Sequence, residues 1–221
     1  MPSPARSLPS LDDLVLIGDI HGDAARYCGL IAGLEAAHPG CYSIQLGDLQ
    51  LPPEALADIN PARHWFLRGN HDDPAQCRQD PHYLGDFGLI EVGDRAIFFV
   101  GGALPSPNEG GETWAPELSE PELEEAQACY AGAARRIDLV LSHEWSPGGW
   151  RPPEQWGATR QAFSNLKKLY FPSLWICAHR RKEASREFRA LDGSCFYYQV
   201  GARSAVPFAT IRAKSPRPPM P

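Results

Sequence analysis

Five hydrophobic runs in this chain end directly in residue types that bind metal ions. The runs cover residues 14–17, 44–46, 65–67, 139–141 and 174–177. The donors that follow them, in chain order, are Asp19 and His21, Asp48, Asn70, His143, and His179. Because ligand sites in open α/β sheets lie off the carboxyl ends of the strands, the pattern predicts that these side chains meet in one crevice. Two carboxylates, an amide and several imidazoles gathered in this way describe a metal site.

The donor types favour a site for two cations. Asp19 and His21 can hold one ion from the same side, and Asp48 can join two ions because a carboxylate has two oxygens with several lone pairs. The remaining donors would complete the second ion: Asn70, His143 and His179. No cysteine is in the set, so we expect two divalent ions such as Mn, Fe, Zn or Ni rather than thiophilic metals.

Two such ions favour hydrolysis of phosphate esters. Ions about 3.5–4 Å apart lower the pKa of a bridging water and clamp the attacking and leaving oxygens of an in-line displacement. His71 is adjacent to Asn70 but is not needed as a ligand, so it is the natural proton donor to the leaving alkoxide. A lone Gly-Asp after a strand is usually a turn, and a lone buried His is usually structural. Because these motifs recur in order, each after a strand, a metal site is favoured over a set of unrelated turns and structural histidines.

The chain resembles the calcineurin-like metallophosphoesterase superfamily over about residues 14–200. The resemblance lies in an ordered set of motifs: GDIHG from Gly18, GD at Gly47, RGNHD from Arg68, SH at Ser142 and a final His179. It implies an α/β fold, a four-layer αββα sandwich of two mixed sheets with outer helices. It also implies one metal on Asp19, His21 and Asp48. The other ligand set follows: Asp48, Asn70, His143 and His179. His71 matches the proton-donating histidine of the family.

Two departures from the family pattern concern the cations and the acid. The last motif is usually Gly-His-x-His, whereas Arg181 stands here in the place of the second His. The protein-phosphatase branch extends its second motif with an Asp that orients the catalytic His and an Arg that holds phosphate; Leu51 and Pro52 occupy those places. Asp72 or Asp73 could support His71 instead. Arg180 or Arg181 could hold the phosphate, or could form a solvated charge cluster with Lys182.

These features predict a dinuclear phosphoesterase, most simply a phosphomonoesterase, in which a hydroxide bridging the metals attacks phosphorus. The alternatives are a phosphodiesterase or nucleotide hydrolase on the same site, and a metal-binding interaction module that has lost turnover. The substrate is a phosphorylated compound of a class that the motifs leave open. A nuclease is disfavoured, because a net charge of −6 and a pI near 5.6 give no electrostatic footprint for nucleic acid.

The composition of the 221 residues predicts one domain over residues 11–213, with flexible ends at 1–10 and 214–221. The six cysteines are scattered without a CxxC motif, so we expect free thiols. The N-terminus lacks a signal-peptide pattern and no run could span a bilayer, which favours a cytoplasmic protein without a membrane partner. Oligomeric state is left open.

The elements that must position the donors follow from periodicity. Helical spacing predicts a helix over 23–38 between the first two strands, giving a βαβ unit, and further helices over 120–134 and 161–170. Hairpins are expected between 89–92 and 95–100 and between 186–191 and 194–200, the latter around Asp192-Gly193. The segments 104–118 and 144–160 resist assignment, and loops of this length are more often functional than accidental. The second could instead be an irregular loop that its tryptophans hold on the surface.

Overall fold

The computed structural model describes residues 6–102, 124–125, 128–129, 132, 136–144, 172–179, 185–189 and 195–215. The strands are β1 (Arg6–Leu8), β2 (Leu14–Ile17), β3 (Tyr42–Gln45), β4 (His64–Phe66), β5 (Phe87–Val92), β6 (Arg95–Val100), β7 (Arg136–Ser142), β8 (Leu174–Cys177), β9 (Arg186–Arg189), β10 (Phe196–Gln199) and β11 (Ala205–Pro207). The helices are α1 (Ala24–Ala37), α2 (Pro74–Cys77), α5 (Phe208–Lys214) and the 3-10 turn η1 (Pro53–Leu56).

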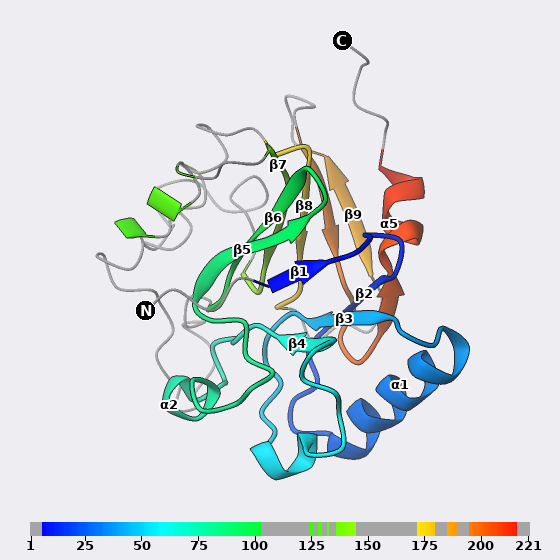
Figure 1. Ribbon diagram of the computed structural model, residues 1–221, viewed down its shortest axis with the longest axis vertical. Helices are drawn as coiled ribbons and strands as arrows, with labels where there is room; N and C mark the ends of the chain where they lie inside the picture. Colours follow the sequence, from blue (N-terminus) through cyan, green and yellow to red (C-terminus); the bar gives the residue numbers. More distant parts are fainter. Residues whose placement is uncertain are drawn as a thin grey trace.

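The strands form two mixed sheets. The larger has seven strands in the order β1-β5-β6-β7-β8-β10-β9, and the smaller has four in the order β11-β2-β3-β4. Strands β2, β3 and β4 run parallel, as do β6, β7, β8 and β10, whereas β11 and β9 are antiparallel to their neighbours. Figure 1 shows the small sheet below the large one, with α1 at its outer side.

The main core lies between the two sheets. Alternate residues of β2, such as Leu14 and Leu16, point into it, together with Trp65 from β4. From the large sheet, the residues of this cluster include Ile97, Phe99, Leu139, Leu141, Leu174, Ile176, Phe196 and Tyr198. Because side chains alternate along a strand, this packing fixes the register and therefore the position at which each strand ends.

Helix α1 covers the other face of the small sheet. Its Tyr27 and Ile31 are buried in a second cluster with Ile17 and Phe66. Asp23 caps the helix, since its carboxylate accepts the backbone N–H of Arg26 at 3.0 Å. The predicted α/β sandwich of two mixed sheets is thus confirmed. The helices expected over 161–170 and over most of 120–134 lie outside the described residues, as do the two long segments except residue 144.

The other sequence-based predictions of elements agree with the structure. All five hydrophobic runs contribute strands, and β2, α1 and β3 form the expected βαβ unit with parallel strands. Both predicted hairpins are present as antiparallel pairs, β5 with β6 and β9 with β10. The turn at Asp192-Gly193 is outside the described part of the chain.

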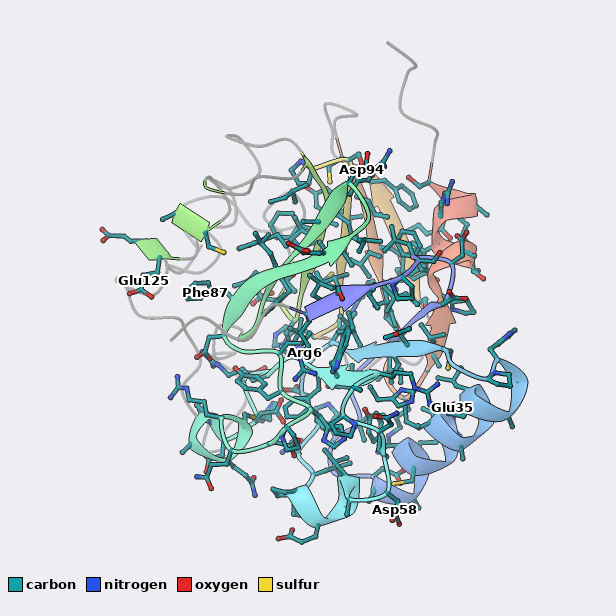
Figure 2. The ribbon with its side chains drawn as sticks, viewed as in Figure 1. Arg6, Glu35, Asp58, Phe87, Asp94 and Glu125 are labelled. Carbon is teal, nitrogen blue, oxygen red and sulfur yellow. The ribbon has the colours of Figure 1, made fainter. Side chains whose placement is uncertain are left out.

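The structure differs from the sequence-based expectation in the described part of the N-terminal segment, residues 6–10. Residues 1–10 were predicted to be flexible, yet Arg6–Leu8 forms β1 and pairs in parallel with β5. Arg6 supplies much of the reason: its guanidinium donates to the carbonyl oxygens of Pro61 and Pro81 at 2.9 and 2.7 Å and lies over the Trp65 ring. Figure 2 shows Arg6 between β1 and β4, where it ties the edge of the large sheet to the small one.

The remaining general expectations concern cysteines and membranes. All six cysteines are free, as predicted, and four of them are buried. Among the helices that the structure describes, none is long and apolar enough to cross a bilayer. The described fold therefore depends on packing between the sheets rather than on disulfides.

Helix α1 provides a test of its own geometry. A methyl group added at Gly29 would meet no atom within 4 Å, so Gly29→Ala should raise the free energy of unfolding by about 0.5–1 kcal/mol through helix propensity. Gly40, just after the helix, has φ +89°. There Gly40→Ala should lower that free energy by roughly 1–2 kcal/mol. Urea titration of both variants measures the difference, and an equal response of the two would contradict the backbone described here.

Candidate metal centre

The five strand-end motifs converge on one place in the structure. Two groups of side chains each bring one ligand atom per residue to within 4.8 Å of the others. The first contains Asp19, His21 and Asp48; the second contains Asp48, His143 and His179. The groups share Asp48, so the ends of β2 and β3 in the small sheet meet those of β7 and β8 in the large one.

In the first group the His21 ring is oriented by a neighbour. Its Nδ1 lies 2.9 Å from Gln50 Oε1 and donates to that oxygen, because a carbonyl-type oxygen can only accept. Its Nε2 then faces Asp19, at 3.9 Å from Oδ2. This Nε2 is buried and has no hydrogen-bond partner in the described part of the chain. A lone pair held in this way beside a carboxylate is suited to a cation.

In the second group His143 is fixed in the same manner. Its Nδ1 donates to the Leu46 carbonyl oxygen at 2.7 Å, which leaves Nε2 facing the site. That Nε2 lies 3.5 Å from Asp48 Oδ2 and 2.9 Å from His179 Nδ1. Asn70 joins the group, with Oδ1 3.3 Å from the same nitrogen. Asn70 is buried, and its Nδ2 has no hydrogen-bond partner among the described residues.

The electrostatics of the centre reflect two carboxylates out of water. Burial raises the pKa of Asp19 to about 6, against the opposing effect of His143. Burial acts in the same direction on Asp48, but His143 outweighs it and holds the pKa of Asp48 well below its usual value. Although burial disfavours a charged His143, Asp48 raises the pKa of that imidazole to about 10. Without a bound cation, the group formed by Asp19, Asp48 and His143 therefore retains a proton.

The glycines of the motifs make room for the ligands. Gly47 has φ +99°, and a Cβ there would lie 2.5 Å from His143 Nδ1. A Cβ at Gly69 would overlap the Asp48 carboxylate. Gly47 before Asp48 and Gly69 before Asn70 are therefore required by close approach of the opposing segment, which is a reason for these GD and GN pairs beyond turn formation.

The backbone is strained at the ligands themselves. Among the described residues, five other than glycine have positive φ, and three of them are His21, Asp48 and His179, at 52°, 56° and 56°. A fourth is Gln50, the partner of His21. Such conformations cost roughly 1–3 kcal/mol each and cluster at functional sites. Their concentration here indicates that ligand placement, rather than backbone stability, determines these loops.

Asp72 is used differently from our expectation. It is buried, and its oxygens accept three backbone N–H groups: from Asp48 at 2.8 Å, Gln50 at 2.7 Å and Gly69 at 2.7 Å. Burial and Asp48 raise its pKa. These bonds join the loop after β3 to the loop after β4, so Asp72 positions the loop of Asp48, the residue that the two donor groups share. The expected contact with the His71 side chain is not among its bonds. Asp73, the other candidate, caps α2 through Ala75 N.

His71 lies beside the centre but in neither donor group. Its ring stands edge-on to the ring of His21, with centroids 5.7 Å apart. Its backbone N–H donates to Asp48 Oδ1 at 3.0 Å, which fixes the main chain next to the shared carboxylate. The candidate phosphate ligands Arg180 and Arg181 lie outside the described residues.

Sequence reasoning missed the residues that orient the ligands. Gln50 and the Leu46 carbonyl select the ring nitrogens of His21 and His143, as do outer partners of metal-bound histidines in general. A further support is Gln45, whose amide bonds both the N–H and the carbonyl of Gly47. Only Gln45 carried a signal, since a polar residue inside an apolar run must find buried partners.

The donors fit divalent cations of the expected kind. Carboxylate oxygens and imidazole nitrogens suit Mn, Fe, Zn or Ni, and no Sγ belongs to either group found among the described residues. One group offers Asp19, His21 and the shared Asp48, and the other adds an amide to two imidazoles. The orphaned His21 Nε2 is the most direct sign that this arrangement could hold a metal ion.

No family model matches this chain, and no curated protein matches it. Solved structures do. One is described as GAP50, the anchor in the inner membrane complex of Plasmodium, with TM-score 0.54 and 12% identity over 86% of this chain and 71% of that one. A second crystal structure has TM-score 0.55 and 15% identity over 86% and 90%. A novel phosphatase from Mycoplasma pneumoniae has TM-score 0.47 and 15% identity over 86% and 71%. At these identities the likeness shows a shared fold alone.

The hydrogen bonds of Asp72 predict a loss of metal from Asp72→Asn. An amide in this place presents a donor to a backbone N–H, so the free energy of unfolding should fall by about 1–3 kcal/mol. The Asp48 loop should shift, and metal analysis after dialysis should find fewer bound ions. Asp73→Asn is the matched control, because Asn caps helices as well as Asp does. If the Asp72→Asn variant keeps its full metal content and only its turnover is slower, the result would instead support the catalytic role that the sequence predicted for Asp72.

The pKa values predict that metal stabilises the protein more as pH rises. Protons on His143, with a pKa of about 10, and on Asp19, with a pKa of about 6, compete with cations. Without metal, the raised pKa of Asp19 stabilises the folded protein at pH values below the pKa that Asp19 has in the unfolded chain. This stabilisation is lost as the pH rises through 6. Added Mn²⁺ or Zn²⁺ should therefore raise Tm more at about pH 8 than at about pH 5.5. Calorimetry of chelator-treated protein measures this, and an equal shift at both pH values would argue against these ligands.

Proposed function

We propose that this chain, which has the fold of the calcineurin-like metallophosphoesterases, hydrolyses phosphate esters at a two-metal centre. The observation that carries the proposal is the pair of donor groups joined by Asp48. A structural metal site needs one closed set of ligands, whereas two incomplete sets with one common carboxylate leave positions for a substrate.

The cations would belong to the two donor groups. Asp19, His21 and Asp48 would hold one of them; the ligands of the other would be Asp48, Asn70, His143 and His179. When bound, two divalent ions supply Lewis-acid polarisation of phosphoryl oxygens and acidify water. The chain contributes a fixed geometry to this chemistry, because Gln50 and the Leu46 carbonyl prevent His21 and His143 from turning their Nε2 atoms away.

His71 is the proposed acid that protonates the leaving oxygen. It adjoins the ligand Asn70 in sequence and the ligand His21 in space, yet its ring belongs to neither donor group. A general acid must lie beside the reacting atoms without serving as a metal ligand, and the position of His71 next to His21 but outside both donor groups supports this role. The backbone bond from His71 N to Asp48 Oδ1 holds it at the shared carboxylate.

A phosphate monoester is the substrate class that we propose first. The test is to strip the metals, restore Mn²⁺, Fe²⁺, Zn²⁺ or Ni²⁺ singly, and assay p-nitrophenyl phosphate beside its bis-ester. Turnover of the monoester in preference to the bis-ester is expected. The opposite preference would identify a phosphodiesterase. Absence of turnover with either ester under every metal, despite two bound ions, would identify a metal-binding module without activity.

Two substitutions separate the metal ligands from the acid. Asp48→Asn should abolish turnover and weaken metal binding, because Asp48 belongs to both groups. His71→Ala should retain both ions while kcat falls by about 10²–10⁴-fold, the usual worth of a positioned acid. His38→Ala, at an exposed position after α1, is the control and should leave both properties unchanged. Metal analysis and kinetics measure the split; loss of metal from His71→Ala would refute its role as acid.

A further inference from the structure

A second feature of the molecule is a cavity of about 440 Å³ on the flank of the loop that carries Asp19. In the described part of the chain it is lined by Arg26, Ala202, Arg203 and Ser204. Its volume is within the range of sites for small ligands, about 300–1,000 Å³. None of these residues belongs to the donor groups of the metal centre.

The cavity is attached to the metal centre through the backbone. Arg203 N–H donates to the Asp19 carbonyl oxygen at 2.7 Å, and the Gly18 N–H donates to the Ser204 carbonyl oxygen at 3.1 Å. Strand β11 continues this pairing, with Ala205 opposite Ile17 of β2. The segment that forms the cavity wall is therefore hydrogen-bonded to the segment that carries the first ligands, and the two sites hold a fixed relation.

Two of the residues that line this cavity are arginines, Arg26 and Arg203. Arg26 Nη2 donates to the Arg203 carbonyl oxygen at 3.2 Å, which draws the Arg26 side chain from α1 over the loop. No ion pair joins either arginine to a carboxylate among the described residues. The nearest acid along the chain, Asp23, uses its Oδ1 to accept the backbone N–H of Arg26. Two positive charges on a protein of net charge −6 thus line the cavity, and no carboxylate of the residues that the structure describes forms an ion pair with them.

The backbone of Arg203 adds a second sign of function. Its φ is 55°, so Arg203 is the one described non-glycine residue with positive φ that is neither a proposed ligand nor Gln50. This conformation costs roughly 1–3 kcal/mol. In it, Arg203 lines the cavity while its backbone N–H bonds to Asp19.

We propose that this cavity binds a second phosphoryl group of the substrate, so that the physiological substrate is a small molecule carrying two phosphates. The proposal rests on the proposed function: the metal centre would hold the phosphoryl group that reacts, and Arg26 and Arg203 would hold the other. Guanidinium forks match phosphate oxygens in pairs of charge-assisted hydrogen bonds. Sequence reasoning had placed the phosphate-binding cation at Arg180 or Arg181; the cavity assigns a separate role to Arg203.

Direct binding tests the cavity without turnover. Chelator-treated protein is titrated with pyrophosphate in a calorimeter. The Arg26→Gln/Arg203→Gln variant should bind about tenfold more weakly than wild type, because one charge-assisted hydrogen bond is worth at least about 1.5 kcal/mol and 1.4 kcal/mol is tenfold in Kd. The matched control is Arg212→Gln/Lys214→Gln, which removes two exposed charges from α5 and should bind as wild type does.

Inhibition of the metal-loaded enzyme gives a second measurement. With p-nitrophenyl phosphate as substrate, methylenebisphosphonate should inhibit wild type about tenfold more tightly than methylphosphonate, and the double arginine variant should lose this ratio. Equal pyrophosphate binding by wild type and the variant would overturn the subsite even if p-nitrophenyl phosphate is hydrolysed. If pyrophosphate binding depends on the two arginines but the protein hydrolyses no ester, the proposed subsite would stand and the proposed function would be wrong.

Discussion

Burial of three carboxylates at one place is the constraint on which the rest of this structure depends. Asp19, Asp48 and Asp72 are each at most 3% exposed, and an unpaired buried charge costs several kcal/mol. Each accepts backbone N–H groups from another loop: His179 N for Asp19, His71 N for Asp48, and Asp48 N and Gln50 N for Asp72, which also accepts Gly69 N of its own loop. The hydrogen bonds that compensate the buried charges are therefore the same ones that hold the loops in place.

The packed sheets make this arrangement possible. The strands that end in the ligands are almost completely buried, with Leu16, Leu46 and Ile176 at 0% exposure, so their ends cannot shift to relieve strain. The positive φ values of Asp48 and His179 persist because the core on one side and the carboxylates on the other determine the loops between them. A site built in this way is organised before a cation or substrate arrives, which is the condition for electrostatic catalysis.

Local patterns were sufficient to predict the five strands that end in donor residues. An apolar run followed by Gly and Asp, as at Gly47 and Asp48, combines a strand signal with a breaker and a donor. The roles that depend on three-dimensional contacts were not readable. Asp72 follows His71 in sequence, so it suggested a catalytic partner, whereas its contacts are with backbone groups of two loops. Strand β1 was missed because three residues near a Pro-rich terminus carry no periodicity, and their pairing depends on distant carbonyl groups that receive Arg6.

The same distinction applies to Arg203. Sequence proximity pointed to Arg180 and Arg181, which lie outside the described residues, whereas the fold places the backbone of Arg203 beside that of Asp19. Strand β11 runs antiparallel to β2 with Ala205 opposite Ile17, so continuing that register past the ends of both strands places Arg203 opposite Asp19. The hydrogen bond from Arg203 N to the Asp19 carbonyl shows that the pairing does continue. A three-residue strand containing Pro207 gives no sequence signal, and Pro is tolerated there because β11 is an edge strand. The edge of the small sheet thus places the backbone of Arg203 opposite that of Asp19.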